Sequence, residues 1–260
     1  MADSEKLRKE QWLSGPFISG LKIKSNYDNF AELYDALDID IFSALLADEF
    51  VEFFAKKNAG CERPFRKHLD LCCGTGTLCQ IFAEEGFETK GVDLSEGMLA
   101  FARQKCPGLE FVCADVLSYE DTQEFDIVTC ISDAVNHFGE LPTFQKFCNN
   151  AAKLLREGGY LIFDSITEDV LELREERIAR DGGVELVYCS TRLGPNKVLT
   201  ELQYFDDGKL QGTFSNEEFY FTPAEIQEAL EAAGFRVESC SRHFPPIDEE
   251  KKLKIFARKL

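Results

Sequence analysis

The most restrictive feature of this sequence is a series of short, almost uninterrupted apolar runs that alternate with segments of helical periodicity between residues 66 and 166. Runs without polar alternation are typical of strands that are buried on both faces of a parallel sheet. Their alternation with helices indicates a doubly wound α/β fold. The predicted strands span residues 67–72, 89–94, 109–115, 125–132 and 160–166, and the predicted helices between them span 77–85, 95–106 and 141–156.

The pattern changes in the last third of the chain. Three runs of alternating character within residues 184–220, separated by the turn sequences GPN (194–196) and DDG (206–208), predict an antiparallel meander. Thr222-Pro-Ala-Glu225 then forms a capping box with proline at the first helical position, which predicts a helix that ends at Gly234.

The two final runs, 235–241 and 252–260, are joined by a short loop and predict an antiparallel hairpin. Added to the five earlier strands, the hairpin predicts a Rossmann-like sheet of seven strands whose last strand is antiparallel. Before residue 66, apolar residues at spacings of three and four within 27–57 predict a helical cap. We therefore expect a single domain over 1–260, with a cap (1–65), a cofactor-binding core (66–170), inserted antiparallel strands (182–221) and a C-terminal helix and hairpin of the core (222–260).

The charge of the chain restricts its partners. The formal net charge is −18 without a cluster of basic residues, and such a surface repels the phosphates of nucleic acids but tolerates a neutral or cationic substrate. No apolar run approaches the roughly 18 residues that a membrane span needs, and the N-terminus lacks the apolar run of a signal peptide. We expect a cytoplasmic monomer or homodimer with reduced thiols and no metal site, because the ten cysteines form no C-x-x-C pair.

A glycine loop follows the first predicted strand in the sequence HLDLCCGTGT (68–77). Gly74 and Gly76 match the first two glycines of the dinucleotide fingerprint G-x-G-x-x-G, whereas Cys79 occupies the third position. Such a loop alone could also be a tight turn without a ligand. Asp70, just before the loop, would repel a pyrophosphate and attract an ammonium group.

Two further aspartates end the next two strands. Asp93 lies 17 residues after Gly76, where a carboxylate can accept hydrogen bonds from both ribose hydroxyls, and Asp115 ends the third strand. The carboxyl ends of neighbouring parallel strands form the edge at which ligands bind in open α/β sheets. A ligand with an ammonium group, a ribose diol and an aminopurine but no phosphate fits these three carboxylates. S-adenosylmethionine has all of these groups, and NAD fits poorly.

The segments D-L-C-C-G-T-G-T, G-V-D-L-S-E-G-M-L and C-A-D-V resemble motifs I, II and III of the class I S-adenosylmethionine-dependent methyltransferases of the small-molecule type. The resemblance covers residues 27–170, and residues 222–260 by topology. It is specific for the cofactor and says little about the acceptor. The resemblance implies a cofactor site built from Tyr27, Tyr34, Asp70, Cys72, Gly74, Gly76, Asp93, Leu94, Met98, Asp115, Val116, Ile131 and Ser132.

The resemblance also implies where the acceptor binds. The segment SDAVNHF (132–138), after the fourth strand, offers Asp133, Asn136 and His137 to the substrate, and His137 is the best general base among them because its ordinary pKa is near 6.5. Tyr34 would close over the reactive centre. Alternatively, His137 packs the following helix and the tyrosines pack the cap, without a role at the site. Further substrate candidates are Tyr188 and Arg192 in the meander and His243 in the last loop.

The leading hypothesis is methyl transfer to N or O of a small molecule by in-line displacement. A base is needed only if the nucleophile must lose a proton, so a neutral amine could react without one. A catalytically silent cofactor-binding subunit and a non-methylating enzyme with the same cofactor remain alternatives. A nicotinamide-dependent oxidoreductase fits less well, and a nucleic-acid methyltransferase is disfavoured by the charge and by the absence of an N-P-P-Y-type tetrapeptide.

Overall fold

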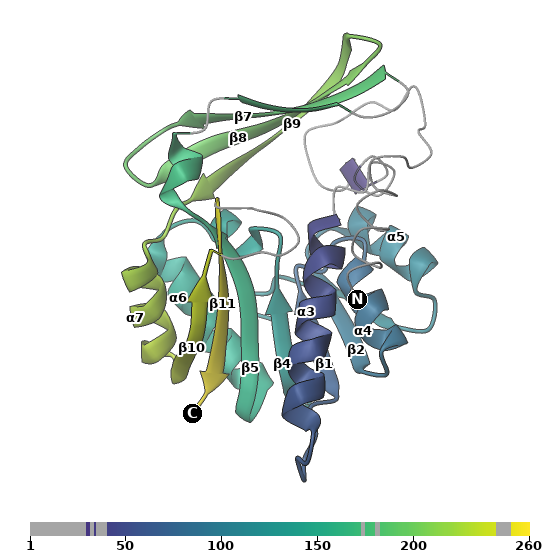
Figure 1. Cartoon of the computed structure of the whole chain (residues 1–260), viewed down its shortest axis with the longest axis vertical. Coiled ribbons are helices and arrows are strands. Elements are labelled where there is room, and N and C mark those ends of the chain that lie inside the picture. Colours follow the sequence, from purple (N-terminus) through teal and green to yellow (C-terminus); the bar gives the residue numbers. More distant parts are fainter. Residues whose placement is uncertain (1–29, 32–33, 35–40, 173–174, 180–182, 243–250) are drawn as a thin grey trace.

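The predicted parallel strands and the terminal hairpin form one seven-stranded sheet in the order β10-β11-β5-β4-β1-β2-β3 (Figure 1). The computed structural model describes residues 30–31, 34, 41–172, 175–179, 183–242 and 251–260. Only β11 runs antiparallel, between β5 and β10, as the sequence predicted. The strands are β1 (Lys67–Leu71), β2 (Glu88–Asp93), β3 (Glu110–Cys113), β4 (Phe125–Cys130), β5 (Leu155–Ile166), β10 (Phe235–Ser241) and β11 (Lys252–Lys259).

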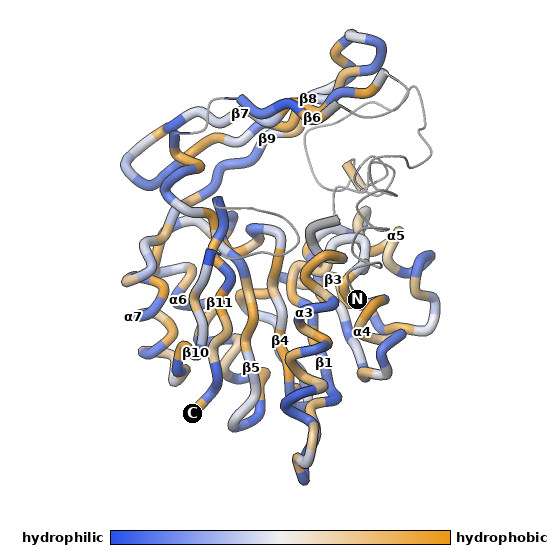
Figure 2. Tube along the Cα trace, viewed as in Figure 1, coloured by the Kyte–Doolittle hydropathy of each residue, from blue (hydrophilic) through white to orange (hydrophobic). Residues whose placement is uncertain are grey.

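Helices cover both faces of this sheet, which explains the continuous apolar character of its strands. On β4, Ile127 packs against one face, with Phe50 of α3 and Phe82 of α4, while Val128 packs against the other, with Phe147 of α6. Figure 2 shows apolar residues along β4, in the middle of the sheet. Complete burial of a side chain of this size stabilises the fold by about 1.5–3 kcal/mol. The helices are α3 (Ile41–Asn58), α4 (Thr77–Glu84), α5 (Glu96–Lys105), α6 (Leu141–Leu154) and α7 (Pro223–Ala232).

A second, four-stranded antiparallel sheet lies across the end of the first sheet at which β4 and β5 finish (Figure 1). Its strands β7 (Val184–Arg192), β8 (Lys197–Asp206) and β9 (Lys209–Phe219) confirm the predicted meander. The edge strand β6 (Glu175–Ala179) was not predicted. Its sequence EERIA begins with three exposed charged residues, so an apolar alternation is missing.

The boundary between α6 and β5 differs from the prediction. The helix was expected to continue to Arg156 and to end at a glycine pair, but it ends at Leu154 and the strand begins at Leu155. The glycines lie inside the strand, where pairing with β4 shifts register. A Cβ atom at Gly159 would lie 2.9 Å from the Arg156 carbonyl oxygen and 3.0 Å from that of Asp126. The glycine therefore permits close approach of two backbones at an irregularity in the ladder.

The predicted capping signals are present. The Ser95 side chain accepts a hydrogen bond from the Met98 amide at 3.1 Å, and Thr222 and Glu225 form the reciprocal capping box. The cap helices are described in part. Phe30 and Leu45 are buried, as their periodicity predicted, whereas Tyr27 and His243 lie outside the described residues. No helix in the described part of the chain has the length and apolar character needed to span a membrane.

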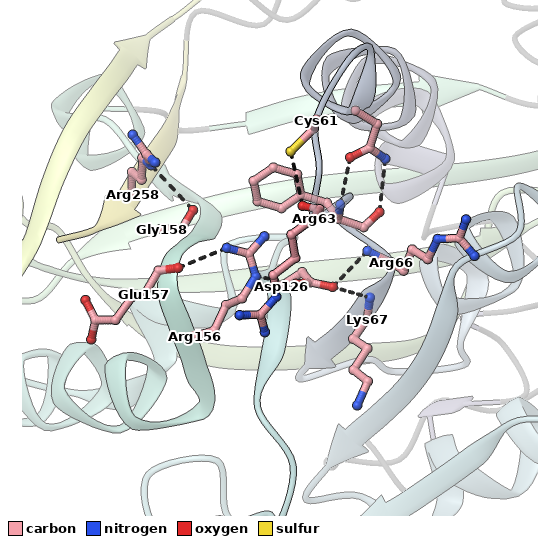
Figure 3. Close-up of polar contacts among 11 residues, drawn as sticks. Cys61, Arg63, Arg66, Lys67, Asp126, Arg156, Glu157, Gly158 and Arg258 are labelled. Atoms are coloured by element: carbon pink, nitrogen blue, oxygen red, sulfur yellow. Dashed lines mark hydrogen bonds and ion pairs between the residues drawn. The ribbon is translucent and has the colours of Figure 1, made fainter.

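The amino end of the sheet is joined to the segment after α3 by Asp126 (Figure 3). Asp126 Oδ2 accepts hydrogen bonds from the amides of Arg66 and Lys67, each at 2.8 Å. Its other oxygen accepts from the buried Arg156 guanidinium, which lies over the ring of Phe65. These bonds tie the start of β1 to the starts of β4 and β5, and the glycine loop lies at the opposite end of β1.

Candidate functional site

The glycine loop connects β1 to α4 and forms one wall of a small pocket. Gly76 has φ of +80°, and a Cβ atom there would lie 3.1 Å from Ala102 and from the Phe111 ring, so only glycine fits this close approach. Residues from the loop, from the end of β4 and from the cap share the pocket. They are Tyr34, Ser43, Asp70, Cys72, Cys73, Gly74, Thr75, Thr77, Ile131 and Ser132. Six of these, Tyr34, Asp70, Cys72, Gly74, Ile131 and Ser132, were predicted as cofactor-binding residues.

Backbone strain is concentrated at this pocket. Among the described residues other than glycine, Cys72, Ser132, Asp133 and Asp207 have positive φ angles, between 46° and 64°. Asp207 belongs to a hairpin turn, but the other three follow β1 and β4 at the pocket edge. Strained backbone of this kind persists where the surrounding structure holds it, and it is enriched at functional sites.

Asp70 is the charged group at the base of the pocket. Its side chain is buried, with Oδ1 accepting a hydrogen bond from the Thr129 hydroxyl at 2.6 Å and Oδ2 lying 3.7 Å from the Cys79 thiol. Burial, opposed in part by Thr129 and Cys79, raises the pKa of Asp70 to about 7. In the described structure no cation contacts this carboxylate, so it is suited to receive one from a ligand.

Asp93, at the end of β2, fastens the glycine loop. Its Oδ2 accepts from the Gly74 amide and its Oδ1 from the Ser95 amide, each at 2.8 Å. These two bonds order the loop. A carboxylate at the end of the second strand is also the group that accepts ribose hydroxyls in nucleotide-binding α/β folds.

The predicted adenine-binding residues lie beyond Asp93. Leu94 is 72% exposed, and Asp115 is exposed with Oδ1 accepting from the Leu117 amide at 2.9 Å. Both therefore offer contact surface at the ends of β2 and β3. Met98 and Val116 are buried, Met98 in the cluster that joins α5 to the second sheet.

A second group of ionisable side chains lies where β9 of the second sheet approaches the end of β4. The Lys252 ammonium is 2.7 Å from Asp133 Oδ2 and 3.4 Å from Asp164 Oδ2, and the Asp133 amide donates to Asp164 at 3.1 Å. Asp164 is fully buried, and one oxygen of each aspartate, Oδ1, is buried without a hydrogen-bond partner among the residues that the structure describes. Glu218, also buried, accepts from the Thr200 hydroxyl at 2.6 Å. We call Asp133, Asp164, Glu218 and Lys252 the carboxylate cluster.

Among the described residues, the cluster contains three carboxyl groups and one ammonium group. Burial is the main cause that raises the pKa of Asp164 to about 7, and likewise the pKa of Glu218 to about 7. Asp133 raises both values and Lys252 opposes both. His137 belongs to the same environment, and burial lowers its pKa although the charge of Asp133 opposes that shift. His137 is therefore neutral near pH 7.

The other predicted substrate residues are placed differently. Asn136 is fully buried: its amide nitrogen donates to Ser165 and to the Phe219 carbonyl, and its oxygen accepts from the Ile166 amide. These contacts give it a structural role between the two sheets. Tyr188 packs against the buried cluster that contains Met98, as does the pocket residue Tyr34. Arg192 is exposed and bonds to Glu172 and to the carbonyls of Gly194 and Pro195, in the β7–β8 turn.

Sequence reasoning missed several groups that the fold brings to the site. His68 was not among the predicted site residues, but it is buried and reaches Asp70 through Thr129. Asp164, Glu218 and Lys252 were not considered. The sequence feature that could have indicated some of these groups is a polar residue inside an apolar run, such as Thr129 in FDIVTC or Asp164 in YLIFDSI.

The fold and this pocket define a class of α/β proteins that bind a ligand across the carboxyl ends of parallel strands. Residues 69–159 match the family model described as a methyltransferase domain. A protein of Geobacillus sp. strain WCH70 whose name assigns it to the methyltransferases is 33% identical over 197 residues, which cover 71% of this chain and 78% of that protein. The chain therefore belongs to the methyltransferase-domain family.

Two other similarities extend this result. The ubiquinone biosynthesis O-methyltransferase of Coxiella burnetii is 28% identical over 191 residues, covering 71% of this chain and 70% of that protein. An S-adenosylmethionine-dependent methyltransferase from Clostridium acetobutylicum has the same fold, with a TM-score of 0.73, 24% identity and coverage of 90% of this chain and 98% of that one. The family and the class I methyltransferase fold that the motifs resembled are thus confirmed.

Proposed function

We propose that this protein transfers a methyl group from S-adenosylmethionine to a small molecule. The observation that carries the proposal is Asp70, a buried carboxylate that lines the pocket behind the glycine loop and has no cationic partner in the described structure. The ammonium group of the cofactor would supply that charge, whereas a pyrophosphate would be repelled. When bound, S-adenosylmethionine supplies an electrophilic methyl group on a sulfonium.

The chain's own residues would bind and orient that cofactor. Asp93 would accept the ribose hydroxyls while keeping Gly74 in place, and Asp115 would accept the adenine amino group beside Leu94. Tyr34 and Tyr188 would cover the reactive end beneath the second sheet and exclude water. Alignment and exclusion of water account for much of the acceleration that such a displacement requires.

We further propose that the acceptor is a basic nitrogen. Within the part of the chain that the structure describes, the carboxylate cluster holds three carboxyl groups against one lysine, and two of its buried oxygens have no hydrogen-bond partner, so a cationic amine would compensate the cluster. Asp133 directly follows the pocket residue Ser132, so its charge would lie next to the proposed reactive end. One carboxylate can accept the ammonium proton, and the neutral nitrogen then attacks the methyl carbon while the carbon–sulfur bond breaks toward sulfur.

A hydroxyl acceptor is the second candidate, because one relative is named as an O-methyltransferase. A hydroxyl must lose its proton to a base, and the neutral His137 has the protonation state that this role needs. Paired amine and hydroxyl analogues of the same carbon skeleton separate the two candidates. Conversion of S-adenosylmethionine to a product other than S-adenosylhomocysteine would instead indicate a non-methylating enzyme, and cofactor binding without any turnover would indicate a silent subunit.

Calorimetry with S-adenosylmethionine, S-adenosylhomocysteine and NAD tests the cofactor. We expect dissociation constants of about 1–100 μM for the first two and no binding of NAD. Asp93→Ala should weaken binding about 10- to 30-fold, because both the ribose acceptor and the bond to Gly74 are lost. Glu96→Ala, which removes an exposed carboxylate from α5, is the matched control and should stay within about twofold. Tight NAD binding, or no binding at all, would overturn the proposal.

The carboxylate cluster is tested by Asp133→Asn in an acceptor assay. Asparagine tolerates the left-handed backbone of this position, so the change removes charge rather than shape. We expect kcat/KM for an amine acceptor to fall about 30-fold while cofactor affinity stays within about twofold. Glu217→Gln, at a nearby exposed carboxylate paired with Lys197, should leave both values unchanged. Equal activity of Asp133→Asn and wild type would exclude this acceptor site.

A further inference from the structure

Asp70 belongs to a buried series of hydrogen bonds that continues to His68. The Thr129 hydroxyl oxygen lies 2.6 Å from Asp70 Oδ1 and 2.8 Å from His68 Nε2. All three side chains are buried. Pairing of β1 with β4 sets Asp70 opposite Thr129, and α4 covers this face, with Phe82 stacked on the His68 ring at 3.9 Å. The series is therefore held by the strand register and not by local sequence.

Counting protons gives the series a direction. Threonine has a single hydroxyl proton, and an ionised carboxylate can only accept, so the Thr129 proton lies toward Asp70. The Thr129 oxygen must then accept from His68, which places the His68 proton on Nε2 and leaves Nδ1 bare. Nδ1 is buried without a hydrogen-bond partner in the described structure, where a bare nitrogen is tolerated better than an N–H group. Burial lowers the pKa of His68 to about 3, so the ring stays neutral.

We propose that His68 is a positioning residue for the cofactor site: its Nε2–H commits the Thr129 proton to Asp70, and thereby keeps the Asp70 carboxylate ionised and fixed for the ammonium group of the cofactor. This inference rests on the proposed function, because it assigns the ligand that Asp70 receives. His68 itself does not line the pocket.

The groups around Asp70 explain why the hydrogen bond from Thr129 matters for its ionisation. Burial is the main cause that raises the pKa of Asp70, the Asp93 charge raises it further, and Thr129 lowers it. Loss of the Thr129 bond should therefore leave Asp70 protonated over a wider pH range, in which it cannot hold an ammonium group as an ion pair. Among the described residues, the other titratable groups that interact with Asp70 are the thiols of Cys73, Cys79 and Cys130.

The test is the pH dependence of S-adenosylmethionine affinity in Thr129→Val and His68→Leu, measured by calorimetry between about pH 5.5 and 8.5. Relative to wild type, both should bind about tenfold more weakly at about pH 6 and within about twofold at about pH 8.5, where Asp70 is ionised in every protein. Titration of the cofactor's own amino group cancels in this ratio. Thr129→Ser keeps the hydroxyl, and His68→Gln offers a side-chain N–H, so both should restore the wild-type profile.

Other pH profiles of cofactor affinity would overturn the proposed hydrogen-bond relay from His68 through Thr129 to Asp70. If Thr129→Val and His68→Leu bind the cofactor with unchanged affinity at every pH, His68 only packs against its neighbours. If they lose the same affinity at every pH, the role of the two residues is purely structural. Solution nitrogen-15 spectra of the wild-type imidazoles give a second test. Because the chain has three histidines, the His68 signals are assigned by comparison with His68→Gln, which is the only variant that this test requires to fold. We expect Nε2 protonated and Nδ1 bare; the opposite tautomer contradicts the proposal. If wild type binds no cofactor at any pH, the proposed function fails, and the tautomer still decides the relay.

Discussion

Asp70→Asn should weaken S-adenosylmethionine binding about 100-fold near pH 7.5, because a charge-assisted contact worth about 2–3 kcal/mol is lost in a buried site. Asparagine has nearly the same shape and can still accept from Thr129, so the loss reports the charge. Calorimetry measures the change directly. Asp169→Asn, which alters an exposed carboxylate paired with Arg242, is the matched control and should bind as wild type does.

The same variant should not lose thermal stability. The pKa of Asp70 is raised from 3.8 to about 7, mainly by burial, so its ionisation costs the folded state free energy. The protonated Asp70 side chain therefore contributes fully to stability below about pH 3.8, and this contribution is lost as pH rises through about 7. Above pH 7 the Asp70→Asn protein should therefore melt at the same or a higher temperature than wild type, measured by calorimetric scanning. A lower melting temperature with unchanged cofactor affinity would contradict both the charge assignment and the site.

Asp126→Ala should lower the free energy of unfolding by about 3–5 kcal/mol, the largest effect on stability that we expect from a single change at the amino end of the sheet. The variant leaves the buried Arg156 guanidinium unpaired and two backbone amides, those of Arg66 and Lys67, without an acceptor (Figure 3). Urea unfolding at neutral pH measures the loss. Cofactor affinity of the folded fraction should be unchanged, because the glycine loop lies at the other end of β1.

Glu157→Ala is the control for this prediction. Its carboxylate lies in the same region but is 75% exposed, and its ion pair with Lys259 spans 3.4 Å. Exposed pairs contribute about 0–1 kcal/mol, so the unfolding midpoint should barely move. The pKa of Asp126 is lowered because Arg156 and the two amides outweigh the effect of burial, so wild type should lose this stabilisation as pH falls below about 3.8. A loss under about 1 kcal/mol in Asp126→Ala would show that Arg156 finds another partner.

The residues around the glycine loop could be predicted closely from sequence, whereas most of the carboxylate cluster could not. Asp70, Gly74 and Asp93 each lie at the carboxyl end of a strand that is evident from a continuous apolar run, and such ends share one edge of a parallel sheet. Asp164 and Lys252, in contrast, come from strands about 90 residues apart, and Glu218 comes from an inserted sheet whose placement over the pocket no local pattern encodes. Asn136 and Arg192 were chosen by position in the chain. The structure gives Asn136 contacts with β5 and β9, and Arg192 contacts with Glu172 and the β7–β8 turn.

The amino-acid sequence by itself determined the seven-stranded α/β architecture, the meander and the glycine loop with its three aspartates, because strand burial, turn chemistry and helix capping are local properties. Only the tertiary structure decided which polar side chains meet. His68 and Thr129 are 61 residues apart, and they contact one another because β1 pairs with β4 in one register. A shift of one residue would turn these side chains to opposite faces of the sheet. The hydrogen bonds that orient Asp70 therefore depend on strand pairing, which the pattern of each strand alone does not specify.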